Sequence, residues 1–347
     1  MRMTLCIAEN RKDCEPGLRL LLASLAHHWP DQSMHVFYPD PDGAFLEWVA
    51  NYPLVELNAL PIDGDWDGYN IKPTLLAALI DQGYDAVTWI DADISFARSP
   101  EPRLMRTTLA EVIICEEAMI DTHGSFGETR TKQWGLDVGR SLPFAFNSCV
   151  LGVTREHREL LSAWQALLRS SEYRAAQRLD FSARPIHLMG DQEVLTALLA
   201  SMRFAGIPIR VLRRGRDVIQ YLGTVGYTMR ERALHLVGGL PPIIHSQGYK
   251  PWWPSTEPKT HYDRILNLYK MLTPYRLIAR QYQDDLVETQ WLKPPTLLSR
   301  LIYLGAFGRP TLIGLPIAAA VDVVRFVRRA NRHRDAPPDR FNHTNAS

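Results

Sequence analysis

The sequence predicts an α/β fold in which a mostly parallel central sheet is flanked by helices. Short apolar runs alternate with longer segments of helical periodicity between residues 3 and 212, which is typical of a parallel sheet. Several of these apolar runs end in polar side chains, as expected where ligands gather at the carboxyl ends of strands. The 347 residues are 46% hydrophobic and 22% charged, an ordinary globular composition for one large domain with an appendage, or for two modest domains.

The first quarter of the chain predicts strands and helices in alternation. Residues 3–8 form a short apolar run, and Pro16 can occupy the first turn of a helix whose apolar face is Leu18, Leu21, Leu22 and Leu25. A second strand over residues 34–38 ends at the loop sequence Pro-Asp-Pro-Asp-Gly. A helix over 44–51 and a further strand over 54–57 follow. Lys72 then stands just before a helix predicted over residues 73–83. It is either a solvated lysine near the helix end or a cation beside an anionic ligand.

The most informative segment is Tyr84–Ile94, which we interpret as a buried strand ending in two carboxylates, Asp91 and Asp93. If the segment is extended, side chains at i and i+2 share a face. Paired carboxylates repel each other unless a cation lies between them, and oxygen ligands suit Mn²⁺ or Mg²⁺. A solvated turn in which the Asp side chains bond to nearby amides is the alternative.

Downstream, strands are expected over 111–115, 144–153 and 207–212, and helices over 155–170 and from 190 onward. Glu116 and Glu117 follow the first of these strands; they either line a cleft or are polar loop residues, and we favour the loop interpretation. The polar, glycine-containing segment 122–139 is predicted to be a flexible loop over the site. Asn147, inside an apolar strand, needs hydrogen-bond partners and is either structural or ligand-binding. Asp191 is suited to cap the helix that it precedes, and Gln192 is free to face a cleft.

The last informative block is Pro241–Trp253. A strand through Ile243 and Ile244 leads to His245, a tight turn is expected at Gly248, and Lys250 follows. A lone histidine after a strand is usually structural. A neutral imidazole can nevertheless complete an oxygen-rich metal site, and a lysine can hold phosphate.

Composition and charge exclude several classes of function. A net charge of +1 provides no overall field for nucleic acid, so no nucleic-acid partner is expected. The four cysteines (Cys6, Cys14, Cys115 and Cys149) have no zinc-binding or CxxC spacing, and reduced thiols favour a cytoplasmic location. We expect no signal peptide, because charged residues interrupt the first apolar run by Glu9.

Four blocks in order resemble the glycogenin and lipopolysaccharide galactosyltransferase family of retaining glycosyltransferases: Asp91-Ala-Asp93, Phe146-Asn-Ser-Cys-Val150, Asp191-Gln192 and His245-x-x-Gly248-x-Lys250-Pro-Trp252. The resemblance covers residues 3–253 and implies a GT-A fold. It departs from the family pattern at Cys149, where glycine is usual, and in a His-to-Lys spacing that is one residue shorter. If position 149 needs a positive φ, cysteine is strained there.

The resemblance implies a role for each matching residue. Asp91, Asp93 and His245 would bind Mn²⁺ or Mg²⁺ on the diphosphate of a nucleotide sugar. Gly248 and Lys250 would meet that diphosphate, with Lys72 near the phosphates or the sugar. Asn147, Asp191 and Gln192 would face the sugar and its reacting carbon, and the region from Ala8 to Asn10 would lie by the nucleobase. The implied activity is transfer of a hexose from a UDP-sugar to a glycan or lipid-linked acceptor.

Two other functions remain open. A nucleotidyltransferase that makes nucleotide sugars would favour a glycine-rich basic loop after the first strand, which Ala8–Asp13 lacks. A non-catalytic protein that binds a nucleotide sugar or glycan would tolerate the loss of Gln192, whereas an enzyme should lose turnover.

The C-terminal part differs in pattern. We predict a catalytic domain over 1–258, a helical appendage over 259–335 and a disordered tail over 336–347. Residues 297–327 are strongly apolar, but the longest uncharged run, 310–321, is too short to span a bilayer. A basic cluster follows (Arg325, Arg328, Arg329, Arg332 and Arg334). The segment is therefore either a peripheral attachment to the inner face of the membrane or a helix packed on the catalytic domain.

Overall fold

The structure is a computed structural model. It describes residues 2–58, 68–105, 110–117, 126–221, 227–248, 250–253, 258, 260, 261, 264, 267, 273–293, 296–316, 318–320, 322–324 and 327. The predicted basic cluster from Arg325 to Arg334, the tail over 336–347 and most of the segment 259–272 lie outside these residues.

A seven-stranded sheet forms the centre of the molecule, in the order β3-β2-β1-β4-β7-β6-β8. Its strands are β1 (Met3–Ala8), β2 (Met34–Phe37), β3 (Val55–Asn58), β4 (Ala86–Ile90), β6 (Val112–Glu116), β7 (Phe146–Thr154) and β8 (Ile209–Leu212). Only β7 runs antiparallel to its neighbours, β4 and β6. Every residue of β4 and β7 is buried, as expected for central strands covered on both faces.

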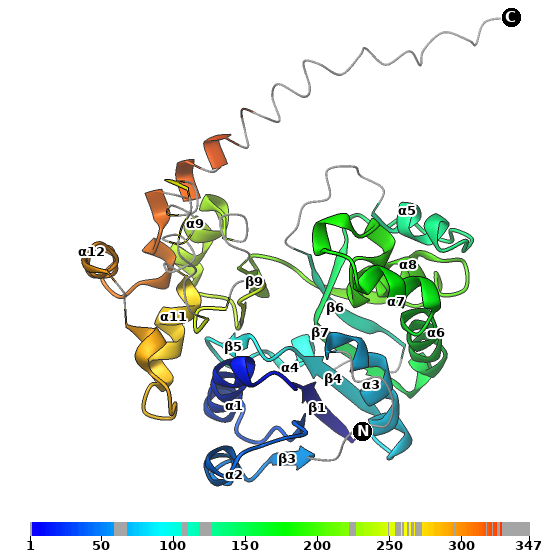
Figure 1. Cartoon of the computed structure of the whole chain (residues 1–347), viewed down its shortest axis with the longest axis horizontal. Helices are drawn as coiled ribbons and strands as arrows, with labels where there is room; N and C mark the ends of the chain where they lie inside the picture. The colour runs from blue at the N-terminus through cyan, green and yellow to red at the C-terminus, as the bar shows by residue number, and fades with distance from the viewer. Residues whose placement is uncertain are drawn as a thin grey trace, which may run out of the picture.

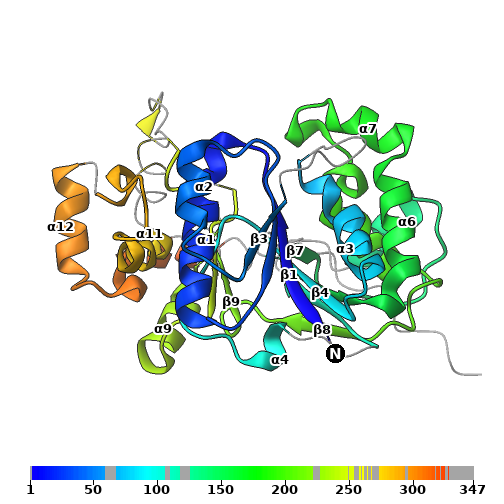
Figure 2. The ribbon, with the colours of Figure 1, turned by 90° about the horizontal axis from the view of Figure 1, so that it is seen from below.

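Helices cover both faces of this sheet, so the predicted α/β fold with a mostly parallel sheet is confirmed. Figure 2 shows α1 (Glu15–His28) and α2 (Gly43–Val49) on one face, and α3 (Lys72–Asp81) and α6 (Arg158–Leu168) on the other. The remaining helices of this part are α4 (Pro102–Met105), α5 (Phe126–Gln133), α7 (Ser171–Gln177), α8 (Asp191–Ala200) and α9 (Met229–Gly238). Trp164 of α6 is fully buried against the α3 and α8 side of the core, where leucines of all three helices meet.

A second, three-stranded sheet was not predicted in full. It consists of β5 (Ile94–Phe96), β10 (Ile243–His245) and β9 (Val218–Gln220), with β10 in the middle. β5 continues the chain directly after the Asp91–Asp93 segment, and it pairs with β10 in antiparallel fashion. This small sheet therefore brings residues 94 and 245 together across about half of the chain.

The C-terminal helices continue outward from α1 (Figures 1 and 2). α11 (Pro274–Ala279) packs through Tyr275 and Ile278 on a cluster that includes Leu20 of α1 and Ile244 of β10. α12 (Leu297–Gly305) lies farther out, and its Tyr303 is buried beside α11. Within the described residues, none of the helices combines the length and the apolar character needed to cross a bilayer. The predicted division of the chain at residue 258 remains a prediction.

Two structural expectations were wrong. The predicted flexible loop over 122–139 contains helix α5, because Arg130 and Thr131 anchor it on α8 through Glu193 and the Ala197 carbonyl. The segment Asp91–Asp93 is a turn rather than extended chain, closed by the Ile94 amide, which donates to the Asp91 carbonyl at 3.2 Å.

Cys149 is not strained by a positive φ. Phe307 is the single non-glycine residue with a positive φ in the described chain.

Candidate active site

A cavity of about 570 Å³ opens at the carboxyl ends of β1 and β4, the place expected for a ligand site in such a sheet. Every residue predicted for the site lines it: Ala8, Asn10, Lys72, Asp91, Asp93, Asn147, Asp191, Gln192, His245, Gly248 and Lys250. Residues from six separate stretches of the sequence are thus brought to one cavity. Their individual roles remain proposals.

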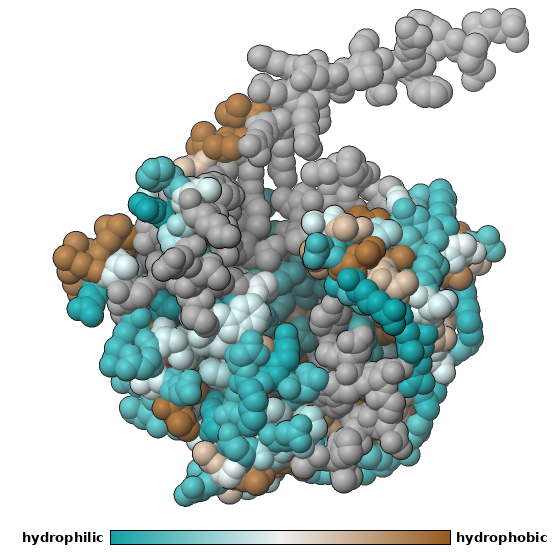
Figure 3. Space-filling model, viewed as in Figure 1, coloured by the Kyte–Doolittle hydropathy of each residue, from teal (hydrophilic) through white to brown (hydrophobic). Residues whose placement is uncertain are grey.

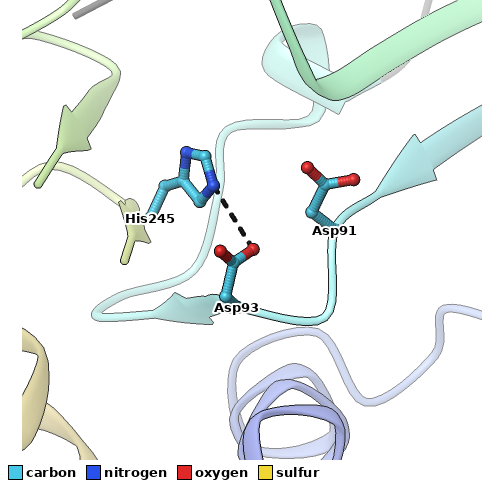
Figure 4. A group of neighbouring side chains, drawn as sticks. All are labelled: Asp91, Asp93 and His245. Carbon is cyan, nitrogen blue, oxygen red and sulfur yellow. Dashed lines mark ion pairs between the residues drawn. The ribbon is translucent and has the colours of Figure 1, made fainter. Parts of the chain in front are cut away.

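Asp91, Asp93 and His245 form the acidic centre of the cavity (Figure 4). One ligand atom from each lies within 4.8 Å of the others, close enough to hold one metal ion. The Asp93 and His245 side chains are buried, and His245 Nε2 lies 3.3 Å from Asp93 Oδ1. A solvated turn is therefore excluded for Asp93.

Pairing in the small sheet creates this centre. In the register between β5 and β10, His245 stands opposite Ile94, the residue after Asp93. The Ser246 amide then donates to the Asp93 carbonyl at 2.9 Å and extends the ladder by one step. Asp91 is fixed from the large sheet, because its amide donates to the Cys149 carbonyl of β7 at 2.9 Å.

The donor set fits a hard divalent cation. Gln220 donates its Nε2 to the Glu116 carbonyl, so its Oε1 faces His245 Nδ1 and accepts that proton. The imidazole can then present Nε2 as a ligand, the tautomer that a metal-binding histidine needs. Two carboxylates and one imidazole leave coordination positions for ligand oxygens, as Mn²⁺ and Mg²⁺ require.

Charges around Asp93 keep it ionised. Burial acts to raise the pKa of Asp93, but Lys250 and His245 outweigh burial and hold it well below the usual range. Burial acts to lower the pKa of His245, and in the metal-free site the Asp93 carboxylate reverses this and raises it well above the usual value. A metal ion that binds His245 Nε2 therefore displaces a proton. Lys250 pairs directly with Asp93 and also donates to the Ser246 carbonyl at 3.1 Å. Gly248, with φ of 77°, makes the turn that returns Lys250 to the site.

A second ionic cluster lies beneath the first. The Lys72 ammonium is only 2% exposed and lies 3.1 Å from Asp91 Oδ1 and 3.3 Å from Asp191 Oδ2. It also donates to Ser148 Oγ at 2.8 Å, and that hydroxyl donates to Asp191 at 2.9 Å. Burial acts to lower the pKa of Lys72, but the two carboxylates raise it above its ordinary value. Lys72 thus joins a candidate metal ligand to Asp191.

Asp191 does not cap its helix, contrary to expectation. Gly190 occupies the N-cap position of α8, and Asp191 is the first helical residue. Its carboxylate turns to Lys72 and Ser148 instead, because a buried carboxylate is stabilised more by a cation than by helix-end amides. Trp164 donates to the Asp191 carbonyl at 3.0 Å and fixes the start of the helix.

Glu117 was interpreted as a loop residue and is instead buried in the cavity wall, 7% exposed. Its carboxylate accepts from Asn147 Nδ2 and from Gln192 Nε2, both at 2.7 Å. Gln247, which the sequence did not single out, donates to the same carboxylate at 2.9 and 3.2 Å. Three amides from β7, α8 and the segment after β10 therefore meet at one side chain.

The end of β1 also borders the cavity. Ala8 is the last residue of that strand, and Asn10 follows Glu9, which is buried. The Glu9 carboxylate accepts from the Asn10 amide at 3.1 Å and from the Arg11 side chain at 2.8 Å. Trp252 and Trp253 also line the cavity, so the wall carries aromatic surface as well as charge.

The sequence matches no described protein family, and no curated protein matches it. Among solved structures, the apo form of WbbM, a bifunctional glycosyltransferase, is similar over 76% of this chain at 12% identity, with a TM-score of 0.49; the matched part spans 51% of that protein. A glycosyltransferase involved in glycosylation of the major capsid of PBCV-1 is similar over 79% of this chain and 100% of its own, at 10% identity and a TM-score of 0.39. At such values the function has to be argued from this chain's own site.

Proposed function

We propose that this chain is a metal-dependent glycosyltransferase. It transfers a hexose from a nucleotide diphosphate sugar, with UDP as the nucleotide, to a glycan or lipid-linked acceptor. The observation that carries the proposal is a cavity that contains a candidate metal centre, two lysines paired with its aspartates and a set of side-chain amides.

The acidic centre and Lys250 suit a diphosphate. Bound by Asp91, Asp93 and His245, Mn²⁺ or Mg²⁺ would supply positive charge for the departing diphosphate. Lys250 already holds its ammonium at this centre by pairing with Asp93, and it can offer further donors to phosphate oxygens. Lys72 is enclosed by its partners, so its role is to hold Asp91 and Asp191 at a fixed separation.

Asp191, Gln192 and Asn147 are proposed to face the sugar. The transferred sugar passes through an oxocarbenium-like state, which nearby carboxylate and amide oxygens stabilise. Asp191 is held by Lys72 and Ser148, so it positions and stabilises rather than attacks. We therefore propose front-face transfer with retention of the anomeric configuration.

Turnover distinguishes this function from its two rivals. With a panel of UDP-hexoses and Mn²⁺, the protein should slowly form UDP and free hexose, with water as the acceptor in place of the glycan. Gln192→Ala should lower the rate of UDP formation by about a hundredfold without weakening UDP binding. Gln82→Ala, at the exposed end of α3, is the matched control. Pyrophosphate release from UTP and a sugar phosphate would instead identify a nucleotidyltransferase. UDP binding with no turnover on any donor or acceptor would identify a binding protein.

We also propose that α12 contacts an anionic lipid surface. Its outer face exposes Leu297 and Leu304 by more than 70%, with Leu298 and Leu301 beside them, and Phe307 follows at 83%. Figure 3 shows this apolar patch at the edge where α12 lies in Figure 1. Lys293, Arg300 and Arg309 flank the patch, and the sequence has no acidic residue from 290 to 321. Apolar surface with a basic border suits an interfacial helix.

Vesicle sedimentation tests this attachment. The protein should sediment with vesicles that contain phosphatidylserine, and Leu301→Asp should abolish sedimentation while UDP binding is kept. A second copy of the chain on the same face would give a dimer in solution without vesicles, and that outcome would contradict the proposal. Leu179→Asp, at an exposed leucine outside α12, is the control.

A further inference from the structure

The amide cluster at Glu117 has a defined polarity. A carboxylate only accepts hydrogen bonds, so Asn147, Gln192 and Gln247 must each turn an NH₂ group toward it. Their carbonyl oxygens are therefore directed elsewhere. Glu117 thus fixes which end of each amide is available to anything bound in the cavity.

One of these oxygens has no partner in the described structure. Asn147 Oδ1 already accepts one hydrogen bond, from the Cys149 amide at 2.9 Å. Gln247 Oε1 is buried and accepts no hydrogen bond, although the side chain lines the cavity. A buried acceptor without a donor is unfavourable, and such groups commonly mark the position of a bound molecule.

The chemistry of this wall selects the kind of group that can bind there. Phosphate oxygens are acceptors and carry negative charge, so they are unsuited to a carbonyl oxygen beside a carboxylate. A hydroxyl group can donate to Gln247 Oε1 and is neutral. The two lysines of the cavity, Lys72 and Lys250, lie at the acidic centre instead. Its arginines are already paired with carboxylates, Arg11 with Glu9 and Arg130 with Glu193. The cavity is therefore divided into an end that suits a diphosphate and a wall that suits a polyol.

We propose that Gln247 is a specificity-determining residue that accepts a hydrogen bond from a hydroxyl of the transferred sugar, and that Glu117 is the positioning residue that orients it. The inference rests on the proposed glycosyltransferase function and deepens it. The side chains around Glu117 then determine which sugar is preferred, and the acidic centre provides the affinity for the nucleotide diphosphate.

Calorimetry with Mn²⁺ separates these two contributions. Dissociation constants are measured for UDP, UDP-glucose and UDP-galactose on the wild type, Gln247→Met, Glu117→Gln and the control Gln82→Met. The wild type should bind one UDP-hexose more tightly than UDP. Gln247→Met keeps the side-chain length. It should reduce the ratio of the UDP and UDP-hexose dissociation constants by about tenfold, the equivalent of one buried hydrogen bond, and leave UDP affinity unchanged. Glu117→Gln should reduce discrimination between the two hexoses as well, because an amide at 117 cannot accept from all three neighbours.

The outcomes are distinct. If UDP binds to the wild type but this ratio is the same in Gln247→Met and in the control, the assignment of Gln247 is overturned. If neither UDP-hexose binds more tightly than UDP, the side chains around Glu117 make no favourable contact with the sugar, and the inference also fails. Failure of UDP itself to bind would instead reject the proposed function. A merely structural role for Glu117 would lower the unfolding temperature without changing the preference between hexoses, and this result would remove Glu117 from the proposal.

Discussion

At the scale of single residues, the site is held by buried charges that neutralise one another. Lys72 is the clearest case, since one ammonium serves Asp91, Asp191 and Ser148 at once. A buried cation of this kind cannot be removed without leaving its partners uncompensated.

Lys72→Met should therefore destabilise the fold by about 3–5 kcal/mol, because the buried Asp191 and the partly exposed Asp91 lose their shared cation. Urea unfolding followed by circular dichroism measures the effect. Lys12→Met is the matched control, since Lys12 is half exposed and its pairing with Asp42 is on the surface. If the two variants unfold at the same urea concentration, Lys72 does not hold the site together.

The sequence identified most of these residues, but not all of their partners. Asp91, Asp93, His245 and Lys250 stood out because each follows a strand or a tight turn. Glu117 did not, because a glutamate after a strand has no feature that distinguishes it from an ordinary loop residue. Its importance arises from three amides that lie 30, 75 and 130 residues away.

At the scale of elements, α1 packs unusually close to the site. A Cβ atom on Gly17 would lie 2.4 Å from Cη2 of Trp252 and 2.8 Å from the carbonyl oxygen of Ala92. Ala92 lies between the two aspartates, and Trp252 follows Lys250 by two residues. The glycine therefore lets α1 support both segments of the acidic centre directly.

Gly17→Ala should displace α1 or both of these segments, and we expect a loss of about 1–3 kcal/mol in unfolding free energy together with weaker Mn²⁺-dependent UDP binding. Calorimetry and thermal unfolding report the two effects. Gly43→Ala, where an added Cβ would meet nothing within 4 Å, should change neither. Unaltered UDP binding in Gly17→Ala would show that the close approach of α1 is not needed by the site.

The long elements were predictable and the short ones were not. Strands β1, β4 and β7 and helices α1, α3 and α6 carry clear periodicity over enough residues to be recognised. β5, β9 and β10 have three residues each, which is too few for a pattern, and they form because Ile94, Ile219 and Ile243 are buried against α1 and the C-terminal helices. The pairing that unites Asp93 and His245 is therefore a tertiary property.

At the scale of the whole molecule, the C-terminal helices are tied to the sheet region by buried tyrosines. The Tyr282 hydroxyl donates to the Phe96 carbonyl of β5 at 3.1 Å and lies 2.8 Å from His28 Nε2. Burial raises the pKa of Tyr282 from 10.0 to about 12. The neutral phenol is thus favoured in the folded chain.

The raised pKa of Tyr282 should make the fold less stable as pH rises above 10. The contribution of the neutral Tyr282 phenol to the free energy of unfolding is fully present below pH 10, where the phenol of the unfolded chain is also neutral. This contribution is lost as pH rises toward about 12. Unfolding midpoints across this range should fall less steeply for Tyr282→Phe than for the wild type. Parallel curves for the two proteins would contradict the predicted contribution.

The proposed function requires that Asp91, Asp93 and His245 bind a metal that holds a nucleotide diphosphate. Calorimetric titration of UDP with and without Mn²⁺, on the wild type and on Asp93→Asn, tests it most directly. We predict that UDP binds to the wild type only when Mn²⁺ is present and that Asp93→Asn does not bind it under either condition. UDP binding that is equally tight without metal, or that survives in Asp93→Asn, would show that these three residues do not bind the metal that holds the nucleotide.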